Sequence, residues 1–173
     1  MYRLLAMITT MIIILALSAC ATTPTASPES APAVTLGDLT ISEPWVRAAS
    51  ASATTNSMSS DSHSSMSMSA TTAGYMTIRN SSAEPDFLIA AAVTDLAEAV
   101  ELHTSTTENG VMKMRQVERI EIPAQGGVEL KPGSFHVMLI GLKRDLKPDE
   151  TVRLTLTFER SGTVEVSAVV RKP

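Results

Sequence analysis

Hydrophobic and polar residues alternate along several short stretches of the chain, and this period of two is typical of β-strands with one buried face. The clearest stretch is 151–159 (TVRLTLTFE), whose Val and Leu side chains share one face with Phe158 while Thr and Arg side chains occupy the other. Ser161-Gly162 separates it from a second alternating run at 163–170, which predicts a hairpin.

A second hairpin is predicted at Asn109-Gly110, because this dipeptide favours the tight turn between two antiparallel strands. Further strands are expected from the remaining alternating or apolar runs, at 34–41, 74–80, 86–94, 98–103, 111–118, 119–122, 127–131 and 133–143. Only 95–100 (DLAEAV) offers even one helical turn. Many short strands separated by turn signals predict an all-β sandwich or barrel.

The N-terminal residues are expected to be a targeting segment rather than part of the domain. Arg3 precedes an apolar run that ends in LSAC, and residues 1–19 therefore predict a secretory signal. The ending resembles a bacterial lipobox, with Cys20 as the lipidated residue. An ordinary signal peptide with a chance cysteine, or an uncleaved anchor, is the alternative. Residues 20–33 then form a Thr/Pro/Ser/Ala tether, and residues 34–173 form the domain.

Composition narrows the function classes. Cys20 is the only cysteine, so a lipidated chain has no thiol left for a disulfide, a zinc ribbon or a cysteine nucleophile. Without residues 1–19, 13 basic side chains face 18 acidic ones, a net charge of −5 that argues against a nucleic-acid partner. No GxSxG, HExxH or glycine-rich phosphate loop indicates an enzyme.

Imidazole and thioether side chains are the distinctive chemistry of the expected mature chain. It has three histidines and seven methionines, and this pair of ligand types suits copper, above all the soft Cu(I) ion. His136 and Met138 share one face of their strand, and Met112 and Met114 share a face across the hairpin turn from His103. The clusters would form a His₂Met₂ site at an exposed edge if the fold joins them. Methionine is also a common core filler, and a lone strand histidine is more often structural than a ligand.

The spacing of these residues resembles a known family. Ten residues separate His103 from Met114, twenty-one separate Met114 from His136, and one separates His136 from Met138. This is similar to the His-x10-Met-x21-His-x-Met motif of periplasmic copper chaperones (PCuAC domains). The runs PWVRA, GYMTIRN, LKPGSFHVMLIGLK and VRLTLTFE resemble family landmarks in the same order, so that the likeness covers residues 34–172.

The resemblance implies a cupredoxin-like Greek-key β-sandwich that binds copper through His103, Met114, His136 and Met138. Two departures are notable. Thr104 stands where many members have a methionine after the first histidine, and Met112 is either a substitute thioether in this chain or a packing residue. Phe135 stands where glycine is frequent, and either shades the site from water or packs against the core.

Residues 49–72 form a low-complexity Ser/Ala/Thr segment and are expected to be a long loop between two strands. Its histidine and methionines suggest an auxiliary copper-binding arm, although an insertion that merely tolerates methionine is an equal alternative. The residues concerned are Met58, His63, Met66 and Met68.

The resemblance implies an exported, lipid-anchored protein that faces the periplasm or extracytoplasmic space and delivers Cu(I). The expected acceptor is the dinuclear copper site of cytochrome c oxidase subunit II, or another copper acceptor, with a thiol-bearing assembly protein as a further partner. Copper scavenging or tolerance, with the metal retained, is the first alternative, and a structural lipoprotein without metal is the second. Blue-copper electron transfer is excluded because it requires a cysteine thiolate.

Overall fold

The computed structural model describes residues 32–51, 70–108 and 110–172, and within these ranges the regular structure is entirely β. No helix in this part of the chain is long and apolar enough to span a membrane. The all-β prediction is thus confirmed. In chain order the strands are β1 (Val34–Leu36), β2 (Leu39–Arg47), β3 (Thr71–Asn80), β4 (Asp86–Val93), β5 (Ala99–Glu108), β6 (Val111–Gln116), β7 (Ile120–Ile122), β8 (Gly126–Leu130), β9 (Phe135–Ile140), β10 (Thr151–Phe158) and β11 (Gly162–Arg171).

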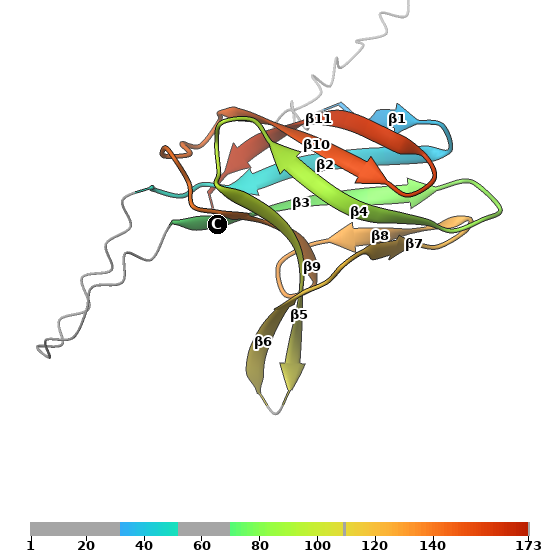
Figure 1. Cartoon of the computed structure of the whole chain (residues 1–173), viewed down its shortest axis with the longest axis horizontal. Helices are drawn as coiled ribbons and strands as arrows, with labels where there is room; N and C mark the ends of the chain where they lie inside the picture. The colour runs from blue at the N-terminus through green and yellow to red at the C-terminus, as the bar shows by residue number, and fades with distance from the viewer. Residues whose placement is uncertain (1–31, 52–69, 109, 173) are drawn as a thin grey trace, which may run out of the picture.

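The described strands join into one hydrogen-bonded sheet that curls on itself, with β10 and β11 above and β7 and β8 below in Figure 1. The path runs β6-β5-β9-β3-β2-β11-β10-β4-β7, with β1 beside β2 and β8 beside β3. The pairs are antiparallel except β2 with β11, which run parallel. The long strand β3 pairs along one edge with β8 in its second half and with β9 in its first half.

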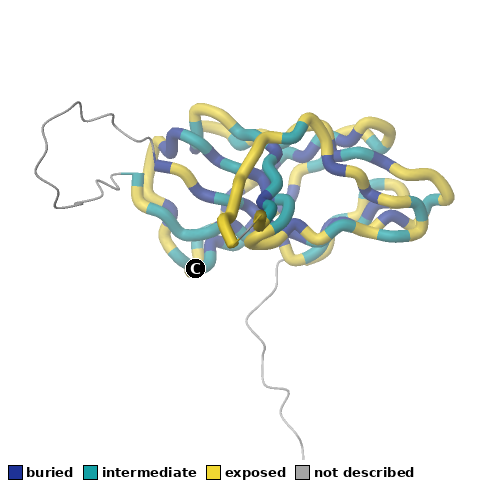
Figure 2. Tube along the Cα trace, turned by 90° about the horizontal axis from the view of Figure 1, so that it is seen from below, coloured by how far each residue is buried: buried dark blue, intermediate teal, exposed yellow. Residues whose placement is uncertain are grey.

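Alternation along each strand fills the space between the layers. In β10, Val152, Leu154, Leu156 and Phe158 are buried, as the sequence pattern predicts, and residues between them are exposed or partly exposed. Buried and exposed stretches accordingly alternate along the trace in Figure 2. Because an apolar side chain contributes about 1.5–3 kcal/mol when fully buried, this core is the main source of stability.

Both predicted hairpins are present. β10 pairs with β11 from Thr151↔Val169 to Phe158↔Gly162, and β5 pairs with β6 up to Glu108↔Val111. Gly110 has a φ of +78°, in the left-handed region where glycine carries no Cβ penalty, as a tight hairpin turn requires. In Figure 1 the β5–β6 hairpin projects below the rest of the sheet.

Three sequence-based expectations for the elements were wrong. Residues 34–41 form two strands rather than one, because Gly37, with a φ of +57°, turns β1 back onto β2. Residues 95–100 form no helical turn, since Ala99 and Val100 already belong to β5. β5 also continues to Glu108, so His103 lies in the middle of its strand rather than at the end.

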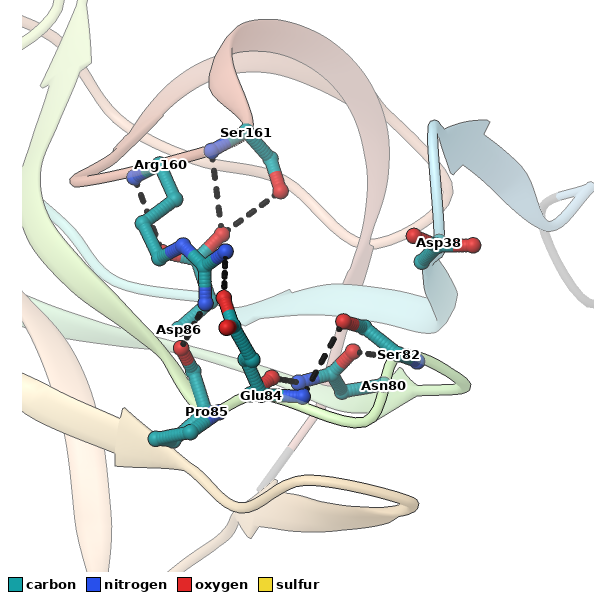
Figure 3. Close-up of a pocket in the computed structure, with 8 residues that line it drawn as sticks. All are labelled: Asp38, Asn80, Ser82, Glu84, Pro85, Asp86, Arg160 and Ser161. Carbon is teal, nitrogen blue, oxygen red and sulfur yellow. Dashed lines mark hydrogen bonds and ion pairs between the residues drawn. The ribbon is translucent and has the colours of Figure 1, made fainter.

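A buried carboxylate, that of Asp86, lies at the end of the sheet shown in Figure 3. Asp86 is 3% exposed and accepts hydrogen bonds from the N–H groups of Phe87 (2.7 Å) and Arg160 (3.0 Å), and from both the N–H (3.0 Å) and the hydroxyl (2.6 Å) of Ser161. Arg160 also pairs with Glu84. This carboxylate thereby joins the start of β4 to the β10–β11 turn.

Candidate metal centre

Three neighbouring strands bring the predicted ligands onto one face of the sheet. His103 of β5 and His136 of β9 are direct cross-strand partners, and their ring centroids are 5.8 Å apart. Met138 lies opposite Glu101 on the same pair of strands, and Met114 of β6 lies opposite Ser105. Each methionine is thus a diagonal neighbour of His103, at a spacing that long side chains can bridge.

Three of the four predicted ligands line a cavity of about 370 Å³, and His103 is the one that does not. Its wall includes both the imidazole of His136 and the predicted thioethers of Met112, Met114 and Met138, and His103 adjoins it through the ring of His136. His136 is only 3% exposed, whereas Met114 is 50% and Met112 is 62% exposed. The sequence predicts an exposed site, but the His136 imidazole is buried. Only the methionines on β6 are exposed, as expected.

Each imidazole has one nitrogen in a hydrogen bond and one without a partner. His136 Nδ1 is 3.0 Å from the carbonyl oxygen of Ser134, and His103 Nε2 is 2.8 Å from the carboxylate of Glu101. The other two nitrogens, His136 Nε2 and His103 Nδ1, are buried and have no partner in the described part of the chain. A buried polar atom without a partner is costly, so each of these nitrogens is poised to bind a ligand.

The surroundings keep His136 neutral. Burial of the ring lowers the pKa of His136 below the ordinary histidine value, the hydrogen bond to the Ser134 carbonyl opposes this shift, and the nearby His103 and Arg47 side chains lower the pKa further. A neutral imidazole has a free lone pair, which a metal ligand needs. The site therefore has a donor nitrogen available at neutral pH.

The donor set favours a soft ion. In the described ranges, no three His, Cys, Asp or Glu side chains gather as a metal-binding group, and the two imidazoles are accompanied by thioethers instead. Thioether sulfur is a soft ligand that favours Cu(I), whereas Mg²⁺, Ca²⁺ and Mn²⁺ prefer oxygen.

Sequence analysis missed three residues of this centre. Arg47 and Tyr75 line the cavity, and the Arg47 guanidinium lies 3.5 Å from the Tyr75 hydroxyl. Tyr75 in turn packs on Trp45, with ring centroids 4.4 Å apart. Both cavity residues come from the runs PWVRA and GYMTIRN, whose role the motif spacing alone does not reveal. Glu101 could have been found, since it lies two positions before His103 and therefore on the same strand face.

The two departures from the family pattern are resolved by strand alternation. Phe135 packs against the hydrophobic core rather than shading the cavity, because it lies on the face of β9 opposite His136. Thr104 is the cross-strand partner of Phe135 and so faces away from His103. The predicted lipidation residue and the predicted loop ligands, Cys20, Met58, His63, Met66 and Met68, lie outside the described residues.

Solved structures with this fold are PCuAC domains. The chain is 22% identical to the apo PCuAC domain from PmoF1, covering 82% of this chain and 100% of that one, with a TM-score of 0.59. The copper-bound PCuAC domain from PmoF2 gives the same identity and TM-score, with 82% and 99% covered. The solution structure of CuI-DR1885 from Deinococcus radiodurans is 35% identical over 75% of this chain and 76% of that one, with a TM-score of 0.52. The predicted cupredoxin-like fold is confirmed.

Sequence relatives agree with this assignment. A protein named lipoprotein Lxx21020, from Leifsonia xyli subsp. xyli (strain CTCB07), is 28% identical over 170 residues, which are 98% of this chain and 90% of the relative. A family model described as LpqE-like lipoprotein matches residues 39–170, a span that includes both histidines and both methionines of the predicted site. The resemblance to PCuAC domains is confirmed, and the chain belongs to the LpqE-like family.

Proposed function

We propose that this protein is an exported Cu(I) carrier that holds one ion between His103, Met114, His136 and Met138. The observation that carries the proposal is the pair of buried, unpartnered nitrogens, His103 Nδ1 and His136 Nε2, on neighbouring strands beside a thioether-lined cavity. Copper in the PmoF2 domain and Cu(I) in DR1885 support the same ligand for this chain. The proposed role is metal binding and transfer, without catalysis.

The distribution of burial suits transfer. The two imidazoles lie on the buried side, whereas Met114 lies on β6, which is exposed along its whole length. An acceptor can therefore approach from β6 and replace Met114 first, while the imidazoles still hold the ion. Stepwise replacement of one ligand at a time lets copper move without being released into water. A buried, closed site would favour retention instead.

We further propose that the carrier is attached to the membrane through lipid on Cys20, with residues 20–33 as the tether and residues 34–173 as the copper domain. The lipoprotein names of its family and of Lxx21020 support export and anchoring. The proposed acceptor is the dinuclear copper site of cytochrome c oxidase subunit II on the extracytoplasmic side. Retention of copper for scavenging or tolerance is the alternative, and slow transfer to every acceptor would favour it.

Competition for Cu(I) against a chromophoric chelator tests the ligand set. We expect one tightly bound ion in the chain, and a loss of affinity of more than about tenfold, or about 1.4 kcal/mol, in both Met114→Leu and His136→Ala. Met112→Leu measures whether Met112, which lines the same cavity and lies on the same strand face as Met114, adds to the binding. A deletion of residues 52–69 measures whether the predicted arm adds weaker ions. Tight binding that survives His136→Ala would refute the proposed site.

A further inference from the structure

The side chain that holds His103 is a carboxylate. Glu101 and His103 share one face of β5, and Glu101 Oε2 lies 2.8 Å from His103 Nε2. The histidine side chain is 14% exposed and the glutamate side chain is 31% exposed, so the contact lies at the rim of the buried centre.

The identity of the acceptor decides where the imidazole proton lies. An ionised carboxylate only accepts hydrogen bonds, so a neutral His103 must carry its proton on Nε2 to form this contact. Its Nδ1 then has the free lone pair, and Nδ1 is the buried atom without a partner. A carboxylate behind a ligating histidine is a recurring arrangement that fixes the tautomer and the ring orientation.

The facing histidine is held in the opposite way. The carbonyl oxygen of Ser134 also only accepts, so His136 donates from Nδ1 and keeps the lone pair on Nε2. The two rings, with centroids 5.8 Å apart and planes inclined by 42°, therefore leave different nitrogens free, Nδ1 on His103 and Nε2 on His136. Two metal–nitrogen bonds of about 2 Å fit a separation of this size.

We propose that Glu101 is a positioning residue that holds His103 in the Nε2–H tautomer, so that this centre binds its ion through Nδ1 of His103 and Nε2 of His136. The tautomer follows from the contacts alone, whereas its role in copper binding rests on the proposed function. Glu101 is also the direct cross-strand partner of Met138. It acts through His103 and is not itself a ligand.

The contact contributes little to folding, which makes the proposal testable by substitution. Ion pairs between partly exposed side chains add little to stability, so Glu101→Ala is expected to fold as the wild type does. Glu121→Ala is the matched control, because Glu121 is an exposed strand glutamate on β7, which pairs with β4 and not with β5 or β9. Equal urea midpoints of the two variants and the wild type establish that any change at His103 is local.

Long-range ¹H–¹⁵N correlation spectra of the ¹⁵N-labelled, copper-free chain read the tautomers directly. We expect a protonated Nε2 on His103 and a protonated Nδ1 on His136. In Glu101→Ala, His103 is expected to become a mixture of tautomers while His136 stays unchanged. Glu101→Gln keeps an oxygen acceptor but adds a competing N–H donor, so its tautomer preference should fall between those two. A protonated Nδ1 on His103 in the wild type, or an unchanged tautomer in Glu101→Ala, would overturn the proposal.

Copper loading then separates this proposal from the one on which it rests. On addition of Cu(I), we expect the Nδ1 resonance of His103 and the Nε2 resonance of His136 to shift, and affinity to fall about tenfold to a hundredfold in Glu101→Ala. Unchanged affinity in that variant would refute the positioning role. Absence of any bound Cu(I) in the wild type would refute the proposed function, while the copper-free spectra would still test the tautomer.

Discussion

Replacement of Asp86 by asparagine is predicted to destabilise the protein strongly, although the two side chains have nearly the same shape. The carboxylate is 3% exposed, and each of its oxygens accepts two hydrogen bonds. Asparagine keeps one oxygen and turns an amide N–H₂ toward the donors that the other oxygen served (Figure 3). The Ser161 hydroxyl can rotate to accept, but a backbone N–H cannot.

The magnitude follows from this mismatch. An unpaired buried donor costs about 1–3 kcal/mol, and each remaining bond loses the extra strength of a charged acceptor. Together these two effects predict that the free energy of unfolding falls by about 3 kcal/mol. A folded domain typically has a free energy of unfolding of about 5–15 kcal/mol, so this is a large share of it. With a urea slope of about 1–3 kcal/mol per molar, the unfolding midpoint should fall by about 1 M or more.

The effect should also depend on pH. Burial raises the pKa of Asp86, but hydrogen bonds from the Ser161 side chain and from the N–H groups of Arg160, Phe87 and Ser161 lower it by more. Because the folded pKa lies below the unfolded one, the stabilisation is complete above the unfolded pKa and is lost as pH falls through the folded pKa. The difference in the free energy of unfolding between the wild type and Asp86→Asn should therefore be largest near neutral pH and smaller in acid.

Urea unfolding at neutral and at acidic pH, followed by circular dichroism, measures both effects. Asp38→Asn is the control, because Asp38 lines the same pocket as Asp86 (Figure 3) but is exposed. This substitution should change the free energy of unfolding by less than about 0.5 kcal/mol. A change of similar size in Asp86→Asn, or a gap that does not narrow in acid, would refute the role assigned to this carboxylate.

Two further predictions concern the metal centre and the sheet. Because burial and the nearby Arg47 guanidinium lower the pKa of His136, its ring should gain a proton only below the ordinary histidine range. NMR titration of the His136 ring in the copper-free chain tests this, and protonation that begins at or above the ordinary value would contradict it. Gly127→Ala should lower the melting temperature by about 3 °C or more, because its Cβ would lie 2.6 Å from the carbonyl oxygen of Ile78 and force β8 away from β3. An unchanged melting temperature would contradict this prediction, because it would show that β8 can move without a loss of stability.

Most of the strands could be predicted because alternation is a local property. Residues 151–159 carry it without interruption, and β10 runs from Thr151 to Phe158 as expected. The errors arose where local patterns were ambiguous. Gly37 interrupts 34–41 at only one position, yet its left-handed backbone is enough to divide the run into two strands.

The position of the predicted ligands on one face of the sheet was predictable for the same reason, but their surroundings were not. His136 and Met138 share a face by strand periodicity, and the Asn109-Gly110 turn sets the β5–β6 register that carries Met114 to the same side. Arg47 and Tyr75 reach the cavity only because β2 and β3 continue the sheet beyond β9. That order depends on contacts between distant parts of the chain, which no local pattern contains.

The nitrogen that is left free on each histidine depends only in part on the neighbouring sequence. Glu101 precedes His103 by two residues and Ser134 precedes His136 by two, so the two hydrogen-bond partners occupy equivalent positions relative to their histidines. One acts through its side chain and the other through its backbone carbonyl, and they bind opposite nitrogens. Sequence spacing can therefore identify the residues that surround a ligand, whereas the atom that is left free depends on ring orientation. That orientation depends on tertiary structure, because His103 and His136 become neighbours, with ring centroids 5.8 Å apart, only when β5 and β9 pair.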